Sequence, residues 1–318
     1  MSAYMSSFLS RMFWRPPDVK TVPQWIAWRA RRNARKLTNR LPGRLRTWWL
    51  AIHPVAYPSA CPGVTLSVHP NMGDIVSQSL VSTGTWEPVE TEIMLRLVKP
   101  GMTLVDVGAN LGYMTVLGSR QVGPSGRVIA FEPEPGNFAL LTRNVTRNRC
   151  DNVEIHQMAT GAKTGESLTM FLAGQNLGDH RTHADPDEPG RVRITVRSTT
   201  VDAIVAGRRV DFVKMDIQGG EGHALSGMRE TIEQNEAMMV LLEFWPYGLR
   251  RAGTTPSLLL DTLLEAGFSL RLPATSLDQA GKGDLTSPTT RAEILAETAD
   301  ERFEQTVNIL AVRGGAAS

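Results

Sequence analysis

A short glycine-rich segment, Asp106-Val-Gly-Ala-Asn-Leu-Gly112, is the part of the sequence whose residue types and spacing say most about chemistry. It follows a hydrophobic run and precedes a helical pattern, which is the context in which glycine loops bind nucleotide-type ligands. Gly108 permits a turn that bulky side chains could not make, and the neighbouring small residues let a ligand approach the backbone. Asn110 stands where a pyrophosphate loop expects glycine. The spacing therefore favours a cofactor without phosphates.

Two acidic residues end the first two predicted strands. Asp106 suits the amino-acid portion of a cofactor, directly or through water, and the alternative is an acid that organises the loop by accepting hydrogen bonds from nearby amides. Glu132 lies 24 residues after Gly108, about where an acid binds ribose hydroxyls in this architecture. Its two acceptor oxygens match two vicinal hydroxyls. The alternative role for Glu132 is to cap the helix that follows.

Three further acids are expected to converge at one rim of the sheet. Asp216 ends a predicted strand, Glu221 begins the next helix, and Glu243 ends the following strand. Because open α/β sheets bind ligands at the carboxyl ends of their strands, the three could form a base with supporting groups or oxygen ligands for a divalent cation. Glu221 could instead interact with the helix dipole. We prefer Asp216 as the base, with His223 as an alternative.

A polar stretch from Gly174 to Gly190 separates two short predicted strands, Leu168–Leu172 and Val192–Val196. Loops of this length in compact domains are often substrate lids. His180 or His183 could supply a base from this loop, and the two histidines together with Asp179 and Asp185 could bind a metal. The loose spacing of these residues favours ordinary side chains over a metal site.

The elements that must position these residues follow a regular order from about residue 100, where β-branched runs alternate with helical patterns. The expected parallel strands are Thr103–Gly108, Arg127–Glu132, Val153–Met158, Asp211–Ile217 and Met238–Phe244. The expected helices are Gly112–Val122, Pro135–Asn148, Glu221–Asn235 and Pro256–Ala266. An antiparallel edge hairpin is expected from Phe268–Leu272 and Thr306–Arg313, with a loose segment at Ala274–Ser287. The prediction is an α/β fold with a mostly parallel seven-stranded sheet and helices on both faces.

Several motifs beyond the glycine turn complete a family resemblance. They are Gly84-Thr-Trp-Glu87, the run from Lys99 to Tyr113, Phe131-Glu-Pro-Glu-Pro135 with Leu140, Leu141 and Asn144, and Val213-Lys-Met-Asp-Ile-Gln-Gly-Gly-Glu221 with Leu225 and Gly227. In this order, over roughly residues 70–245, the chain resembles the FkbM-type methyltransferases. The resemblance implies a Rossmann-like class I fold, S-adenosylmethionine as the cofactor, and O-methylation of a small-molecule, sugar or lipid-linked glycan acceptor. A divalent cation is an alternative that we do not favour.

The resemblance also implies which residues contact the cofactor. They are Glu87, Gly108, Asn110, Gly112, Tyr113, Glu132, Ala159 and Asp216, to which Asp106 is added for its place after the first strand. Ala159 would approach the adenine. The chain departs from the usual family pattern at Gln218, where an acid normally precedes Gly-x-Glu. One carboxylate function of the family therefore lacks its usual residue here.

The first 60 residues differ sharply in composition from the rest. They hold 11 Lys and Arg against a single acid, and five of the seven tryptophans, whereas the remainder carries a net charge of about −8. The pattern between Pro23 and Leu41 suits a basic amphipathic helix at a membrane surface. The alternatives are tryptophans packed on the catalytic body beneath solvated arginines, and an organellar transit peptide.

Two parts with different roles are therefore expected. A basic, Trp- and Arg-rich helical extension occupies residues 1–60. A Rossmann-like methyltransferase domain occupies residues 61–318, with a cofactor half at about 84–172, a lid-like loop at 173–190 and a substrate rim at 211–250. These boundaries follow from the change in charge and from the order of the motifs.

Composition also bounds location and partners. No apolar run reaches the length of a membrane span and no secretory signal is evident, so we expect a cytoplasmic protein, with peripheral contact at the inner membrane surface as one option. Cys61 and Cys150 lack zinc-type spacing and are expected to be ordinary thiols. The expected partner is a small-molecule or glycan acceptor. No nucleic acid is expected, because Met215-Asp-Ile-Gln218 lacks the Pro-Pro-Tyr type of loop found in amino-directed base methyltransferases.

Two other function classes are compatible with parts of the sequence. A dinucleotide-binding oxidoreductase would use the same strand, loop and helix, but Asn110 and the absence of the phosphate-binding glycines argue against it. A membrane-surface binding module with a non-catalytic methyltransferase-like fold would make residues 1–60 the active part. Saturable binding of S-adenosylmethionine would favour the methyltransferase hypothesis over the oxidoreductase hypothesis.

Overall fold

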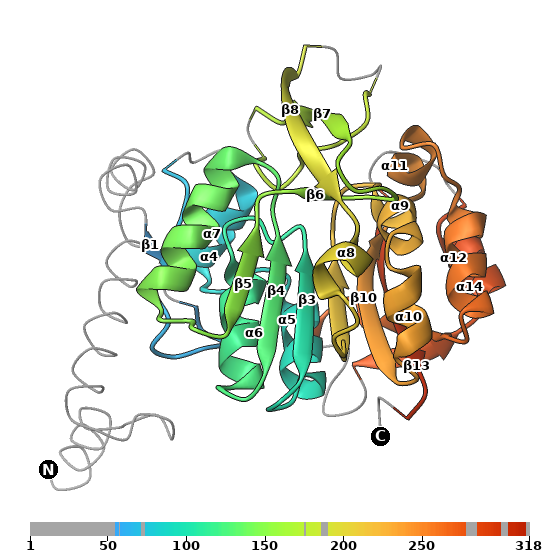
Figure 1. Cartoon of the computed structure of the whole chain (residues 1–318), viewed down its shortest axis with the longest axis horizontal. Coiled ribbons are helices and arrows are strands. Elements are labelled where there is room, and N and C mark those ends of the chain that lie inside the picture. Colours follow the sequence, from blue (N-terminus) through green and yellow to red (C-terminus); the bar gives the residue numbers. More distant parts are fainter. Residues whose placement is uncertain are drawn as a thin grey trace, which may run out of the picture.

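Five hydrophobic runs form the parallel part of an eight-stranded sheet in the computed structural model, which describes residues 55–56, 58–70, 74–174, 176–185, 190–277, 285–299 and 305–315 (Figure 1). The parallel strands are β3 (Thr103–Val107), β4 (Arg127–Phe131), β5 (Val153–His156), β9 (Phe212–Met215) and β10 (Met238–Phe244). With the antiparallel strands β11 (Ser269–Pro273), β12 (Thr286–Thr289) and β13 (Val307–Arg313) included, the strand order is β12-β11-β13-β10-β9-β3-β4-β5. The predicted basic helix and the five N-terminal tryptophans lie in residues 1–54, outside the described residues.

Three antiparallel strands extend the sheet beyond β10. They are β11 (Ser269–Pro273), β12 (Thr286–Thr289) and β13 (Val307–Arg313). The last of these lies between β10 and β11, in register from Met238 opposite Arg313 to Phe244 opposite Val307. The α/β fold class is confirmed, but the sheet has eight strands instead of seven. The additional strand, β12, was missed because its sequence, Thr-Ser-Pro-Thr, has no hydrophobic alternation.

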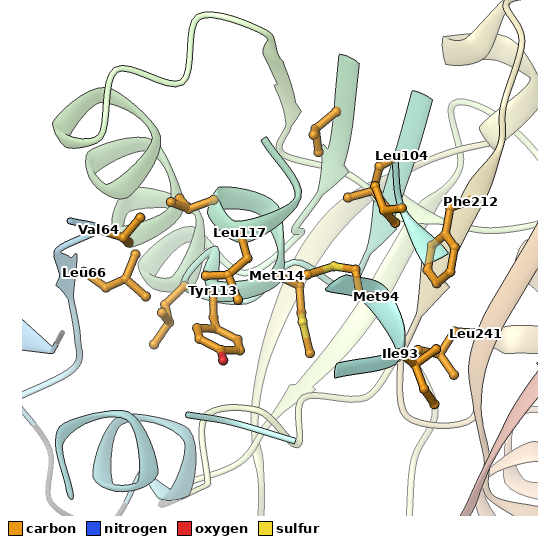
Figure 2. Packing of buried hydrophobic residues seen from close by; sticks show 14 of the residues in the cluster. Val64, Leu66, Ile93, Met94, Leu104, Tyr113, Met114, Leu117, Phe212 and Leu241 are labelled. Atoms are coloured by element: carbon orange, nitrogen blue, oxygen red, sulfur yellow. The ribbon is translucent and has the colours of Figure 1, made fainter. Parts of the chain in front are cut away.

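Helices cover both faces of the sheet, as predicted. Helices α5 (Pro88–Leu97), α6 (Tyr113–Val122) and α7 (Pro135–Arg147) cover one face, and α8 (Val201–Val205), α9 (Glu221–Ser226), α10 (Arg229–Gln234), α12 (Pro256–Glu265) and α14 (Arg291–Glu297) cover the other. Successive strand residues alternate between the two cores: Leu104 packs on the first face and Val105 on the second. Figure 2 shows side chains of the first core, where Leu104 and Phe212 of the strands pack near Met94 of α5.

The predicted helix Glu221–Asn235 is wrong as a single element. The chain forms two short helices, α9 and α10, that are separated at Gly227 and Met228. A Cβ atom at Gly227 would lie 2.0 Å from the carbonyl oxygen of Gly161, so this turn packs directly against distant backbone. An unpredicted helix, α11 (Pro246–Arg251), follows β10. Contacts between segments far apart in the sequence therefore override the local helical pattern here.

A small second sheet stands above the carboxyl ends of the parallel strands (Figure 1). It contains β6 (Ala159–Thr160), β7 (Ser167–Leu172) and β8 (Val192–Thr199). The predicted strand Val153–Met158 ends earlier than expected, at His156. Before the main sheet, the chain forms β1 (Val55–Ala56), β2 (Leu66–Ser67) and α4 (Ile75–Ser82). None of the helices in the described ranges is long and apolar enough to cross a membrane.

Candidate active site

A cavity of about 280 Å³ lies at the carboxyl ends of β3, β4, β9 and β10, beneath the second sheet. The residues predicted from the sequence that line it are Glu87, Asp106, Gly108, Asn110, Tyr113, Glu132, Ala159, Asp216 and Glu243. Gly112, Glu221 and His223 do not line it. Residues that the sequence analysis missed include Trp86, Met158, Thr160, Met170 and Lys214. The structure thus brings together most of the predicted site.

The glycine turn packs against the end of β9. Gly108 has a φ of +86°, and a Cβ atom there would lie 2.0 Å from the carbonyl oxygen of Asp216. Asn110 also has a left-handed backbone, with a φ of 51°, and its Oδ1 accepts a hydrogen bond from the Leu111 amide. Gly112 serves helix packing, because a Cβ atom there would lie 2.7 Å from a methyl group of Leu141. The turn therefore needs glycine at position 108 for the sheet and at position 112 for α7.

Glu132 fixes this turn through two backbone hydrogen bonds. One carboxylate oxygen accepts from the Asn110 amide at 2.8 Å, and the other accepts from the Glu134 amide at 2.9 Å. Burial raises the pKa of Glu132 to about 8. The alternative role of Glu132 as a helix cap is wrong, because Glu134 caps α7 by accepting from the Asn137 amide. Glu132 lines the cavity, where its remaining lone pairs can meet ribose hydroxyls.

Two buried acceptor atoms in the cavity wall lack a hydrogen-bond partner among the described residues. Asp106 uses Oδ2 to accept from the Thr115 hydroxyl at 2.5 Å, and its Oδ1 has no partner. Glu87, whose backbone φ is 44° at the start of α5, likewise has no hydrogen bond to Oε2. Burial raises the pKa of both groups, that of Glu87 to about 7. Unpaired buried acceptors of this kind fit a cationic ligand group.

In a second part of the cavity wall, a lysine, an amide and two acids are joined. The Lys214 ammonium lies 3.0 Å from Asp216 Oδ2 and 3.9 Å from Glu87 Oε2. The Gln218 side-chain amide donates to both Asp216 Oδ1 and Glu243 Oε2, each at 2.8 Å. Gln218 has a left-handed φ of 54°, which turns its side chain back over these acids. The amide thus occupies the position for which the family usually supplies an acid.

The pKa values of the two acids in this wall, Asp216 and Glu243, are shifted in opposite directions. Burial alone would raise the pKa of Asp216, but the nearby Lys214 ammonium and the side-chain hydrogen bonds that Asp216 makes together lower that pKa below its ordinary value. The pKa of Glu243 is raised well above its usual range, first by burial and then by repulsion from Asp216. Burial would lower the pKa of Lys214, but the carboxylates of Asp216 and Glu87 raise it. Lys214 is charged and Asp216 is ionised at neutral pH.

The other two predicted catalytic residues lie away from the cavity. Glu221 is fully buried, its Oε1 accepts from the Ile217 amide at 3.0 Å, and burial raises its pKa to about 7. It therefore shapes the turn that carries Gln218. His223 is exposed, and its Nε2 lies 2.7 Å from the carbonyl oxygen of Ala252. The geometry leaves Asp216 as the base candidate that combines ionisation with access to the cavity.

The predicted lid loop contributes one side of the cavity. Its lining residues are Asn176, Leu177, Gly178, His180 and Thr182. The Leu177 amide donates to Asp74 Oδ1, and the Leu177 carbonyl accepts from the side chain of Asn137. His180 Nδ1 accepts from the Ala173 amide, and burial lowers its pKa. Residues 175 and 186–189 of this loop lie outside the described residues.

The metal alternatives do not fit the side chains. Asp179 and Asp185 both pair with the buried Arg181 guanidinium, at 2.7 and 3.0 Å. Asp216 already accepts from the Lys214 ammonium and the Gln218 amide, Glu243 accepts from the same amide, and Glu221 accepts from the Ile217 amide. Within the described part of the chain, no group of three or more His, Cys, Asp or Glu residues could hold a metal ion.

The FkbM methyltransferase family includes this chain. The profile described as "Methyltransferase FkbM domain" matches residues 106–270, just over half of the sequence, so the chain belongs to this family. The family resemblance predicted from the motifs is thus confirmed. The family match replaces the alternative hypothesis of a dinucleotide-binding oxidoreductase. Residues 106–270 therefore carry a methyltransferase domain of the FkbM type.

Curated relatives share shorter stretches with the chain. Methyltransferase 1 of Beauveria bassiana (strain ARSEF 2860) is 26% identical over 145 residues, covering 39% of this chain and 57% of its own length. Arsenite methyltransferase of Halobacterium salinarum (strain ATCC 700922 / JCM 11081 / NRC-1) is 36% identical over 121 residues, covering 37% and 31%. Methyltransferase sdnD of Sordaria araneosa is 26% identical over 182 residues, covering 46% and 68%. The chain therefore spans less than two thirds of the first two relatives.

Solved methyltransferase structures overlap only loosely with the chain. An S-adenosylmethionine-dependent methyltransferase from Aquifex aeolicus has 15% identity and a TM-score of 0.37, covering 72% of this chain and 90% of its own. Fibrillarin from Aeropyrum pernix, solved with natively bound S-adenosyl-L-methionine, has 13% identity and a TM-score of 0.37, covering 68% of each chain. The fold assignment rests on the strand order and the family match.

Proposed function

We propose that the protein transfers a methyl group from S-adenosylmethionine to a hydroxyl of a small-molecule, sugar or lipid-linked glycan acceptor. The observation that carries this proposal is the Asp216 carboxylate, which lines the cavity and is kept ionised by Lys214 at 3.0 Å. A hydroxyl that becomes a methyl ether must lose its proton, and an adjacent carboxylate can accept it in the transition state. Acceptors that need no base would not require this arrangement.

The donor side of the cavity fits S-adenosylmethionine group by group. Asp106 Oδ1 and Glu87 Oε2, neither of which accepts a hydrogen bond among the described residues, suit the ammonium of its methionine portion. Glu132 suits the ribose hydroxyls, and Ala159 leaves room for the adenine ring. When bound, the cofactor supplies the methyl group and keeps the electron pair of the broken carbon–sulfur bond on its sulfur. The role of the protein is to orient both partners and to hold the released proton.

The acceptor side combines apolar and polar groups. Met170, Thr182 and His180 line it from the second sheet and the lid loop, and Gln218 and Glu243 line it from the main sheet. Hydroxyl, amide and imidazole groups bind sugar-type hydroxyls through hydrogen bonds, while the methionine provides an apolar surface. This lining supports a hydroxylated acceptor of modest size.

Two measurements test the proposal. Calorimetry with S-adenosylmethionine should give saturable binding, and the absence of binding would remove the proposal. Transfer of a labelled methyl group should then be assayed against hydroxylated small molecules, free sugars, lipid-linked glycans and RNA. We expect an O-methyl product from the first three classes, identified by the methoxy signal in nuclear magnetic resonance. Methylation of nitrogen, carbon or RNA alone would contradict the hydroxyl assignment.

We also propose that residues 1–60 bring the enzyme to a membrane surface. The support is compositional: 11 basic residues, one acid and five tryptophans, which together suit anionic headgroups. The whole chain should sediment with vesicles that contain anionic lipid. A chain that lacks residues 1–60 should stay in the supernatant. Equal sedimentation of both would instead favour packing of the segment on the catalytic body.

A further inference from the structure

Five carboxyl groups crowd the region where β3, β9 and β10 end beside α5 and α9. They are Glu87, Asp106, Asp216, Glu221 and Glu243. One ammonium, that of Lys214, acts on four of them. Several closely spaced, largely buried carboxylates cannot all remain ionised, because each charge loses hydration and repels its neighbours. The protons must therefore be distributed unequally.

Distances decide which carboxyl group keeps its charge. Lys214 Nζ lies 3.0 Å from Asp216 Oδ2, within hydrogen-bond range, but 3.9 Å from Glu87 Oε2. Asp216 also accepts from the Gln218 amide at its other oxygen, so both of its oxygens have donors. Glu243 accepts the other proton of the same amide and also shares a side-chain hydrogen bond with Asp216, which lowers the pKa of Asp216. The negative charge is best satisfied on Asp216.

We propose that Asp216 and Glu243 form an unequal pair in which Asp216 is the ionised base and Glu243 is held protonated, with Lys214 and Gln218 as the positioning residues that fix this distribution. The proposal rests on the proposed function for the role of Asp216 as a base. It extends that function by assigning a protonation state to each of the two acids and by giving the lysine and the amide a defined purpose.

The residue at position 218 is what keeps the pair unequal. A glutamine amide donates two protons and carries no charge, so it can link two acids without adding a third negative group. A carboxylate at the same position would repel Asp216 and compete with it for Lys214. The departure of this chain from the usual acid therefore leaves Lys214 with one dominant partner.

The proton balance of the reaction follows directly. The acceptor hydroxyl gives its proton to Asp216 as its oxygen forms the new bond to the methyl carbon. Lys214 and Glu243 keep their protons throughout. After transfer Asp216 is neutral, and Lys214 then faces a neutral acid, which favours release of the proton from Asp216 to solvent.

Infrared difference spectroscopy of the full chain with S-adenosylhomocysteine tests the state of Glu243. At pH 8, Glu243→Gln should remove one protonated-carboxyl band from the wild-type spectrum. The matched control Glu265→Gln, on the exposed surface of α12, should remove one ionised carboxylate band instead. If Glu243→Gln removed an ionised carboxylate band, as the control does, the proposal would be overturned.

A second arm tests Lys214 without depending on the Glu243 variant. With isotope-labelled aspartate, one aspartate band should titrate at low pH in the wild type, and Lys214→Met should raise its midpoint by about 1–3 pH units, since an adjacent cation is removed. Lys214→Arg should restore the low midpoint, which a purely structural role would not predict. An unchanged midpoint in a folded Lys214→Met variant would overturn the assignment.

These spectra need no methyl acceptor, so they separate the two proposals. If the bands behave as expected but no hydroxyl is methylated, the unequal pair stands and the proposed function fails. If hydroxyls are methylated but Glu243 is ionised, the proposed function stands and the unequal pair fails. Circular dichroism of each variant provides the check on folding.

Discussion

The two walls of the cavity are held by different kinds of interaction. On the donor wall, backbone geometry dominates: the turn at Gly108 contacts the end of β9, and Glu132 binds two main-chain amides. On the acceptor wall, side chains hold one another, since Lys214 and Gln218 connect Asp216 to Glu243. A wall built from backbone admits few substitutions without strain. In a wall held together by charged and polar side chains, one substitution can change the pKa values while the fold is kept.

The largest effect is expected on the acceptor wall. Asp216→Ala should lower turnover by about a hundredfold or more, the usual contribution of a general base, because the acceptor proton loses its carboxylate. Affinity for S-adenosylmethionine should stay within about tenfold of the wild type. Methyl-transfer kinetics together with calorimetry measure both quantities. Full activity in this variant would end the assignment of Asp216 as the base.

The corresponding change on the donor wall is Gly108→Ala. The new Cβ atom would lie 2.0 Å from the carbonyl oxygen of Asp216, and the φ of +86° disfavours an L residue. We expect cofactor affinity to fall by about tenfold or more, with a loss of about 1–3 kcal/mol in the free energy of unfolding. Calorimetry and denaturant unfolding test this. Gly253→Ala, which shares the positive φ but faces open space, is the matched control.

A smaller effect is expected when the charge beside Asp216 is changed. Asp216 must be ionised to act, and its lowered pKa places the loss of activity at acidic pH, where the carboxylate becomes protonated. Gln218→Glu adds a negative group beside Asp216, which raises that pKa. The acidic limb of kcat/KM should therefore move up by about one pH unit. A limb that stays in place would show that Gln218 does not act on Asp216.

The smallest effects are expected outside the two walls. His223→Ala should leave kcat/KM unchanged, because the imidazole is exposed and faces the carbonyl oxygen of Ala252. Treatment with a chelator should also leave the rate unchanged, because the acid rim is paired with Lys214 and Gln218. Rate measurements with and without chelator check the second statement. A chelator-sensitive rate would revive the divalent cation model.

The donor wall could be predicted from the sequence more fully than the acceptor wall. Its residues belong to short motifs, and the strand, turn and helix around Gly108 lie in the order that the local pattern indicates. Lys214 was missed because a single lysine inside a hydrophobic strand carries no local sign of its partners. A lysine in a strand that is otherwise buried is nevertheless rare without a counter-charge, and this signal could have identified it.

The errors in the fold have the same origin. The helix expected over Glu221–Asn235 is broken where Gly227 meets Gly161, a contact between residues far apart in the sequence. Strand β12 forms by pairing with β11, although its own residues show no strand pattern. Local periodicity predicts an element when its neighbours agree with it. It cannot predict an element that exists only because another segment packs against it.

The place of β13 between β10 and β11 determines when the catalytic rim can be completed. Strand β10 carries Glu243 and pairs along its whole length with Val307–Arg313, which is synthesised more than sixty residues later. Until that segment leaves the ribosome, β10 has β9 on one side and an open edge on the other. Such edges attract other strands. During synthesis we therefore expect a stage in which the strand that carries Glu243 still has one unpaired edge.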